Sequence, residues 1–162
     1  MGSMGAVPIE TLSAAANAVH RELGPGLSEV IYQTALAIDL RKRGCVVETE
    51  VVIPIAYQET YVGFVRADLV VNQCTIVEVK AVAKITEAHM LQLGNYMRWL
   101  PRNRMFQGGG GQGAVVNFGK VASVIGKVVS VIGSCPSESD LEDGETTCED
   151  EDAKVDRGDA HG

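Results

Sequence analysis

Three consecutive segments rich in β-branched residues fill residues 46–82, and they constrain the fold more than any other feature of the chain. Their composition predicts strands over 46–57, 61–71 and 75–82, joined by short polar turns. Pro54 cannot donate a backbone hydrogen bond to a neighbouring strand, so we expect the first strand to lie at a sheet edge or to carry a bulge. The chain is therefore expected to build a β-sheet from this central segment.

Helical patterns flank this segment on both sides. Apolar residues recur every three or four positions over 8–23, and the Gly-Pro-Gly sequence at 24–26 ends this first helix. A second helix is expected over about 28–43, with Gly44 as its C-terminal cap, and a third over about 86–100. The order of elements predicts an α/β fold in which helices cover the faces of a mixed sheet.

The segment after the third helix is rich in glycine. We expect a loop over 101–113, which contains four consecutive glycines, and then a short strand over 114–118. Residues 121–132 are apolar and β-branched, which predicts a last strand.

Charge is divided unevenly along the chain. The formal net charge is −7, but residues 135–162 alone hold 11 acidic and 2 basic residues, which leaves 12 basic against 10 acidic residues in the rest of the chain. We therefore expect a disordered N-terminus or cloning remnant over 1–7, one domain over 8–133, and a disordered acidic tail over 134–162.

Targeting signals and membrane spans are not expected from the composition. No run of about 18 apolar residues occurs, and the N-terminus resembles neither a secretory signal nor a transit peptide. The four cysteines include no Cys-x-x-Cys pair, which favours reduced thiols over a zinc or iron–sulfur site. We expect an intracellular protein, cytoplasmic by default, with an organelle or the nucleus left open.

Charged residues interrupt the apolar strands at three positions. Glu78 and Lys80 point to one face of the third strand, and Asp68 lies within the apolar second strand. Such residues are costly in a sheet unless they serve a site. A two-residue turn after Val71 would send Asp68 and Glu78 to opposite faces, whereas a three-residue connection or a bulge would bring them together. A shared site therefore requires that irregularity.

Polar residues also share faces with apolar ones on two helices. Glu29 lies three residues before Tyr32 on the apolar stripe of the second helix, so its carboxylate is expected to face the core and to need a partner. On the third helix, His89, Gln92 and Tyr96 share a face. The amide and the phenol could orient a carboxylate, a water or a phosphate, or the tyrosine could be a core residue with a bonded hydroxyl.

Two or three carboxylates and a lysine are the groups that metal-assisted hydrolysis of a phosphodiester requires. Mg²⁺ takes oxygen ligands and keeps several waters, so a few carboxylates on rigid strands suffice. The metal polarises the phosphoryl oxygen and lowers the pKa of a bound water, while the lysine positions that water or stabilises the growing charge. The alternative for Asp68, Glu78 and Lys80 is a salt bridge on a solvated sheet face, and for Glu29 a charge favoured by the helix dipole.

The spacing of these residues resembles the PD-(D/E)XK nuclease signature. Asp68 is followed by Glu78-Val79-Lys80, with Arg66-Ala67-Asp68 in place of the Pro-Asp element. Gly26 to Tyr32 spells Gly-x-x-Glu-x-x-Tyr, and two later elements are similar to the same group, Gln92-x-x-Asn95-Tyr96 and Val116-Asn117-Phe118-Gly119. Over about residues 8–130 the chain resembles the GxxExxY proteins of the PD-(D/E)XK superfamily.

This resemblance implies a restriction-endonuclease-like core, a central mixed sheet flanked by helices. It implies that Asp68 and Glu78 bind Mg²⁺ or Mn²⁺, with the backbone carbonyl of Val79 as a third ligand. Glu29 would be the helix-borne acid that completes the site and a candidate further ligand, and Lys80 would act on the attacking water. The supporting residues would be Tyr32, Gln92 and Tyr96.

Two classes of function stay open at this point. The first is a Mg²⁺-dependent nuclease, a phosphodiesterase that acts on DNA or RNA. The second is a noncatalytic subunit of a nucleic-acid-processing or ribonucleoprotein assembly that retains the nuclease fold. The complete set of acids with Lys80 favours the first class, while the weak charge of the body and the acidic tail favour the second. Nucleic acid is the expected partner, no membrane is expected, and a protein partner or a homodimer is left open.

Overall fold

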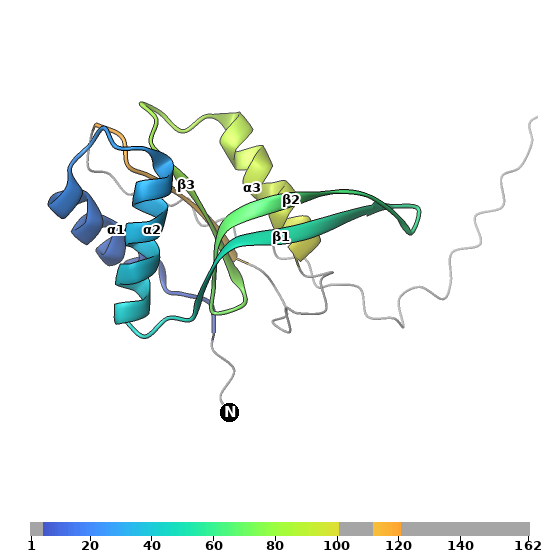
Figure 1. The fold of residues 1–162 in the computed structure, drawn as a ribbon, viewed down its shortest axis with the longest axis horizontal. Coiled ribbons are helices and arrows are strands. Elements are labelled where there is room, and N and C mark those ends of the chain that lie inside the picture. The colour runs from blue at the N-terminus through green and yellow to red at the C-terminus, as the bar shows by residue number, and fades with distance from the viewer. Residues whose placement is uncertain (1–4, 101–111, 121–162) are drawn as a thin grey trace, which may run out of the picture.

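The computed structural model describes residues 5–100 and 112–120, and it shows a mixed β-sheet with helices on both faces (Figure 1). Each of the three helices begins and ends within one residue of its expected position, and the expected α/β class is confirmed. The elements follow one another in the order α1 (Ile9–Leu23), α2 (Glu29–Lys42), β1 (Val47–Tyr57), β2 (Thr60–Val71), β3 (Thr75–Lys80), α3 (Glu87–Trp99) and β4 (Gln112–Asn117).

The sheet of the described residues has the strand order β1-β2-β3-β4. The β1–β2 and β2–β3 pairs are antiparallel. The β3–β4 pair is parallel, and α3 lies in the long crossover connection that such a pair requires. β1 is an edge strand, as Pro54 predicted, and the β1–β2 register also shifts between Ile55 and Ala56. The proline is therefore accommodated where its missing donor is not needed.

β3 is shorter than its sequence predicts. It ends at Lys80 instead of continuing to Val82, because the backbone N–H and carbonyl of Val82 both form hydrogen bonds with the side chain of Asn117. The Val82 N–H donates to Asn117 Oδ1 at 3.0 Å, and Asn117 Nδ2 donates to the Val82 carbonyl at 2.9 Å. A side chain thus replaces the strand partner at this point.

β4 begins inside the segment that the sequence predicts to be a loop. The Gln112 N–H donates to the Cys74 carbonyl at 2.9 Å, which starts the parallel pairing with β3. A Cβ atom at Gly113 would lie 2.4 Å from the sulfur of Met97, so the glycine is what lets α3 pack closely on this strand. The glycine that predicts a loop is here a packing residue.

Two apolar layers hold the sheet between the helices. α1 and α2 pack on one face, in a layer that contains Tyr32, Val77 and Val79. α3 packs on the other face, in a layer that contains Ile53 and Leu93. Glu78 alternates with Val77 and Val79 along β3, so its side chain does not enter the α1–α2 layer.

Several expected features lie outside the described residues. They are most of the glycine-rich loop, the last strand over 121–132 and the acidic tail over 134–162. At the other end, Val7 is buried and its N–H donates to Thr75 Oγ1 at 3.2 Å. The Gly5 carbonyl accepts from Asn72 Nδ2 at 3.2 Å, so contacts with the domain begin three residues before its expected boundary at residue 8. No helix in the described part of the chain is long and apolar enough to cross a membrane.

Candidate active site

β2 and β3 part at the point where two of the expected acidic residues lie. The ladder between the strands has three residue pairs and ends at Leu69 opposite Val77. Asp68 and Glu78 are the next pair in this register, so they face each other where the strands separate. The register arises because three residues, 72–74, connect the strands, and the first two of them have positive φ angles. The irregularity that a shared site requires is present.

Each of the two carboxylates bonds the backbone of the other strand. The Val79 N–H donates to Asp68 Oδ2 at 2.8 Å, and the Asp68 N–H donates to Glu78 Oε1 at 3.3 Å. The carboxylates accept from N–H groups that the parted strands no longer bond to each other. Lys80 Nζ lies 3.7 Å from Glu78 Oε2. We call the side chains of Asp68, Glu78 and Lys80, with the backbone of Val79, the fork.

Burial controls the electrostatics of the fork. Glu78 is only 2% exposed, and its loss of water, together with the charge of Asp68, raises its pKa to about 7 although Lys80 acts against the rise. Desolvation also raises the pKa of Asp68, opposed chiefly by the hydrogen bond from Val79 and by Lys80. The alternative of a salt bridge on a solvated sheet face is therefore wrong: Lys80 and Glu78 do form an ion pair, but Glu78 is buried. A cation between the carboxylates would favour their ionised forms.

The loop before α2 is fixed by Tyr32. Its hydroxyl donates to the Gly24 carbonyl at 2.5 Å and accepts from the Leu27 N–H at 3.2 Å. The ring is fully buried and stacks on Phe118, with 4.5 Å between the ring centroids. Because the loop is tied at two points, it sets where α2 begins and hence where Glu29, the first residue of α2, stands.

Glu29 approaches the fork from the α2 side of the sheet. Its Oε1 accepts from the Ala81 N–H at 3.1 Å, directly after Lys80, and its charge contributes to the raised pKa of Asp68. The expectation that this side chain faces the core is wrong, because Glu29 is exposed. It lies one turn before the buried Tyr32, beyond the edge of the apolar layer. Glu29 therefore stands at the rim of the fork.

Two residues that the sequence did not single out connect α2 to the fork. Gln33 is buried, and its Nε2 donates to the Asp68 carbonyl at 3.0 Å and to Glu50 Oε1 at 2.6 Å. Glu50 Oε2 lies 2.6 Å from Arg66 Nε on the neighbouring strand. Gln33 follows Glu29 by four residues on α2, so helical spacing is the signal that could have found it.

The end of β4 holds the segment that follows the fork. The Phe118 N–H donates to the Lys80 carbonyl at 2.7 Å. A Cβ atom at Gly119 would lie 2.4 Å from the Val82 carbonyl oxygen, so only glycine allows this approach. His20 Nε2 lies 3.0 Å from the Gly119 carbonyl oxygen, which links α1 to the same point. These contacts fix the backbone at Lys80 and in the residues that follow it.

Gln92 and Tyr96 form a pair of their own on α3. Gln92 Nε2 donates to the Tyr96 hydroxyl at 2.8 Å, and the tyrosine is buried in the α3 layer. His89 Nδ1 accepts from the Thr86 N–H at 3.1 Å and closes a capping box at the start of α3. The structure thus joins Gln92 to Tyr96 and gives His89 a role in capping α3. The contacts of the fork described above are instead with α2.

Asp68 and Glu78 are the acids best placed to hold a cation. Within residues 5–100 and 112–120, no three His, Cys, Asp or Glu side chains gather closely enough to form a metal site by themselves. Two adjacent carboxylates are nevertheless enough for Mg²⁺, which is commonly bound through one or two carboxylates and keeps several waters. Desolvation and the charge of Asp68 raise the pKa of Glu78, and such a cation would oppose that rise. The donor set of the fork therefore fits a hard divalent cation.

The family model described as the PD-(D/E)XK nuclease superfamily matches residues 8–128. A search of curated proteins and a search of solved structures each return no match. The matched range contains the fork, α2 and the four described strands.

Proposed function

This chain belongs to the PD-(D/E)XK nuclease superfamily, and on that premise we propose that it is a metal-dependent nuclease that hydrolyses phosphodiester bonds of DNA or RNA. The observation that supports the proposal most directly is the register that sets Asp68 opposite Glu78, with Lys80 two residues further along β3. Buried charges of this kind do not favour folding by themselves, because desolvation offsets their attraction. A catalytic role gives a reason for their presence.

In this proposal, Asp68 and Glu78 hold the metal ion, Mg²⁺ or Mn²⁺, with the Val79 carbonyl as a third ligand. Glu29 completes the site from α2. A bound divalent ion supplies charge stabilisation at the phosphate and a water of lowered pKa. Lys80 is kept beside the carboxylates by its ion pair with Glu78. Its ammonium group positions the attacking water and stabilises the negative charge that grows on the phosphate.

We also propose that the chain belongs to the GxxExxY group within the superfamily. The spacing of Gly26, Glu29 and Tyr32 has a physical reason in the fold. Gly26 has a φ of 98°, which residues with a side chain rarely adopt. Tyr32 ties the loop that follows α1, and Glu29 accepts from the backbone beside the fork. The tyrosine is thus a positioning residue for the acid.

Two further parts of the proposal concern α3 and the limits of the domain. Gln92 and Tyr96 support the site through the packing of α3, since they bond each other in the α3 layer. The domain extends over the expected range 8–133, with the contacts of Gly5 and Val7 added at its N-terminal end, and the acidic segment 134–162 is separate from it. Nucleic acid is the partner that this activity requires.

Cleavage of nucleic acid by the full chain tests the proposed function. We expect Mg²⁺-dependent cleavage of a labelled DNA or RNA strand, and a loss of about a hundredfold or more in rate for Glu78→Ala and for Lys80→Ala. Lys84→Ala is the matched control, because Lys84 is an exposed lysine four residues after Lys80 and its removal changes the net charge equally. Cleavage that survives both fork substitutions would contradict the site assignment.

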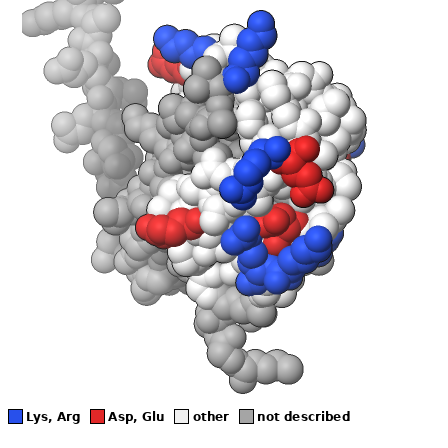
Figure 2. All heavy atoms as spheres, turned by 90° about the vertical axis from the view of Figure 1, so that its left-hand side faces the viewer, with Lys and Arg blue, Asp and Glu red and all other residues white. Residues whose placement is uncertain are grey.

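A noncatalytic role in a nucleic-acid-processing assembly is the second candidate function. Figure 2 shows that Lys and Arg side chains on the α1–α2 side of the molecule lie in small groups with Asp and Glu among them. Such an interleaved surface does not form the broad basic face that a duplex requires. Absence of cleavage for every substrate, together with stable copurification of a protein partner, would favour this second function.

A further inference from the structure

The hairpin of β1 and β2 extends beyond the rest of the sheet. β1 pairs with β2 along its length, up to Tyr57 opposite Thr60, whereas β3 pairs with β2 only as far as Leu69. Residues 51–66 therefore form a two-stranded ribbon, which projects from the body of the molecule in Figure 1. We call residues 51–66 the arm.

The two faces of the arm differ in how they are covered. On one face, Ile53 is fully buried in the α3 layer, and Val65, which stands opposite it, packs against the same layer. On the other face, Phe64 is 60% exposed and stands opposite Pro54, with the exposed Val52 two residues away. None of the described helices covers this second face, which we call the open face.

A bulge adds a second aromatic ring to the open face. The register shifts between Ile55 and Ala56, so that Ala56 stands opposite Tyr61. Ala56 follows Pro54 by two residues and shares its face, which places Tyr61 on the same face as Phe64. Tyr61 is 64% exposed. The open face therefore presents two aromatic side chains to solvent.

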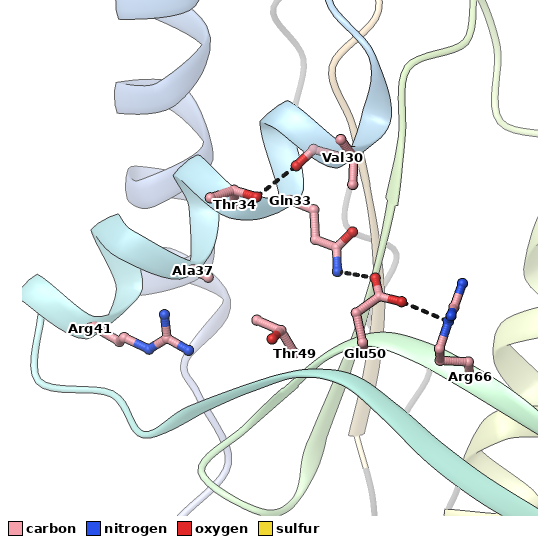
Figure 3. A pocket seen from close by; sticks show the side chains of 8 residues that line it. All are labelled: Val30, Gln33, Thr34, Ala37, Arg41, Thr49, Glu50 and Arg66. Carbon is pink, nitrogen blue, oxygen red and sulfur yellow. Dashed lines mark hydrogen bonds and ion pairs between the residues drawn. The ribbon is translucent and has the colours of Figure 1, made fainter.

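The open face leads into a pocket beside the fork (Figure 3). Arg66 stands opposite Val52 and so shares the open face, and it also lines a pocket of about 370 Å³ between α2 and the base of the arm. Arg41 lines the same pocket from α2, on the side opposite Arg66 in Figure 3. Gln33, a third lining residue, bonds the Asp68 carbonyl. Gln33 therefore connects the pocket to Asp68 of the fork.

The chemistry of this pocket suits a phosphate. Glu50 is the only acid among the described residues that line it, and it is paired with Arg66, so a positive charge remains on Arg41. Arg41 donates one hydrogen bond to the Val47 carbonyl and keeps further N–H groups, because a guanidinium carries five. Planar guanidinium groups match phosphate oxygens in geometry as well as in charge.

We propose that the open face of the arm and this pocket bind single-stranded nucleic acid, with backbone phosphate in the pocket that Arg41 and Arg66 line from opposite sides and unpaired bases stacked on Phe64 and Tyr61. The inference rests on the proposed nuclease function, which it deepens by naming the form of the substrate. Bases in a duplex stack on each other, whereas unpaired bases stack on exposed aromatic rings with little dependence on sequence. The position of the pocket next to the fork would lead the strand toward Asp68 and Glu78.

Equilibrium binding to the full chain in EDTA, where nothing is cleaved, tests the inference. The probes are a short fluorescent single strand, as DNA and as RNA, and the DNA duplex of the same sequence. We expect tighter binding of the single strand than of the duplex, and a loss of about fivefold or more in single-strand affinity for Phe64→Leu and for Tyr61→Leu. Phe64→Tyr keeps an aromatic ring and should retain the affinity. Tyr57→Leu is the matched control, because Tyr57 is 67% exposed on the opposite face of the arm.

The inference fails if Phe64→Leu and Tyr61→Leu bind the single strand as tightly as the unmodified chain, or if the duplex is preferred. It also fails if the open face is covered by a second copy of the chain. Sedimentation would then show a dimer that Phe64→Ala dissociates, with unchanged single-strand affinity. The nuclease function fails separately: an absence of cleavage in Mg²⁺, with binding that still depends on the two rings, would overturn the activity and leave the binding site in place.

Discussion

The arm and the base of the β1–β2 hairpin, where β2 meets β3 at the fork, differ in which side chains are buried and which are exposed. At the base, the carboxylates of Asp68 and Glu78 are largely removed from water and accept hydrogen bonds from the backbone. Along the arm, Phe64 and Tyr61 are exposed although they are apolar or aromatic. Buried charge and exposed aromatic surface are both unfavourable for folding alone, and both are associated with function. β2 thus runs from the fork, where it meets β3, to the exposed aromatic side chains of the arm, and we propose chemistry at the first and recognition at the second.

The opposite faces of the arm sharpen this comparison. The covered face contributes to stability through contacts with α3, while the open face contributes little to stability and is available to a ligand. The hairpin becomes a two-stranded ribbon beyond the end of the β2–β3 pairing, which stops at Leu69, next to Asp68. The departure of one strand therefore creates both the fork and the arm.

The largest effect that we predict separates the two faces of the arm by stability. Ile53→Ala should lower the free energy of unfolding by about 3 kcal/mol, because it removes a fully buried side chain from the α3 layer. Phe64→Ala should change it by less than about 0.5 kcal/mol, because the ring is exposed. Urea denaturation of the two variants measures the difference. Equal losses would mean that the open face is packed, which would break the comparison.

A smaller effect tests the buried charge at the base. The fold raises the pKa of Glu78 to about 7 from an ordinary value of 4.5, so it favours the protonated form. The stability linked to this group is present below the ordinary pKa and is lost as pH rises through about 7. Without metal, the Tm of the unmodified chain should fall between about pH 5 and pH 8.

Glu78→Gln imitates the protonated side chain and isolates this effect. The variant should lack that part of the pH dependence and should melt roughly 5 °C above the unmodified chain near pH 8 in the absence of metal. Glu59→Gln, in the exposed turn at the tip of the arm, is the control and should keep the original profile. Identical pH profiles for the unmodified chain and Glu78→Gln would show that Glu78 does not carry the burial cost described for the fork.

The smallest expected effect concerns the acidic segment and the arginine-lined pocket. Removal of residues 135–162 takes away 11 acidic and 2 basic residues, which would compete with nucleic acid for basic groups. Single-strand affinity should rise by roughly threefold at low salt, with a smaller gain at high salt because screening weakens the competition. Fluorescence anisotropy over a salt series measures this. An affinity that does not change would leave the segment without an inhibitory role.

The class of fold could be predicted from local chemistry alone. Glycine and proline end the first two helices, and β-branched segments form the strands, so helices and strands appear close to their expected limits. The limits that differ depend on residues far apart in the chain. β3 stops because Asn117 captures the backbone of Val82, and β4 starts early because Gly113 fits against Met97. Neither contact leaves a periodic pattern in the sequence.

The candidate site was predictable in its acids and less so in its supporting residues. Asp68 and Glu78 stand out because charge interrupts apolar strands, and their meeting depends on a register that the sequence could state only as a condition. Gln33 and Glu50 meet at a helix–strand contact, where single polar residues resemble ordinary surface positions. Glu29 is exposed rather than inward because its helix begins beyond the apolar layer.

Calorimetric titration with Mn²⁺ tests the central claim, that the fork holds a divalent metal ion. The titration is done near pH 8, where the carboxyl of Glu78 is mostly ionised. The account predicts one saturable site on the full chain, unchanged in Glu59→Gln and lost in Asp68→Asn, which keeps the size of the side chain and removes its charge. Mn²⁺ binding by Asp68→Asn that matches the unmodified chain, or no saturable binding by the unmodified chain, would contradict the account.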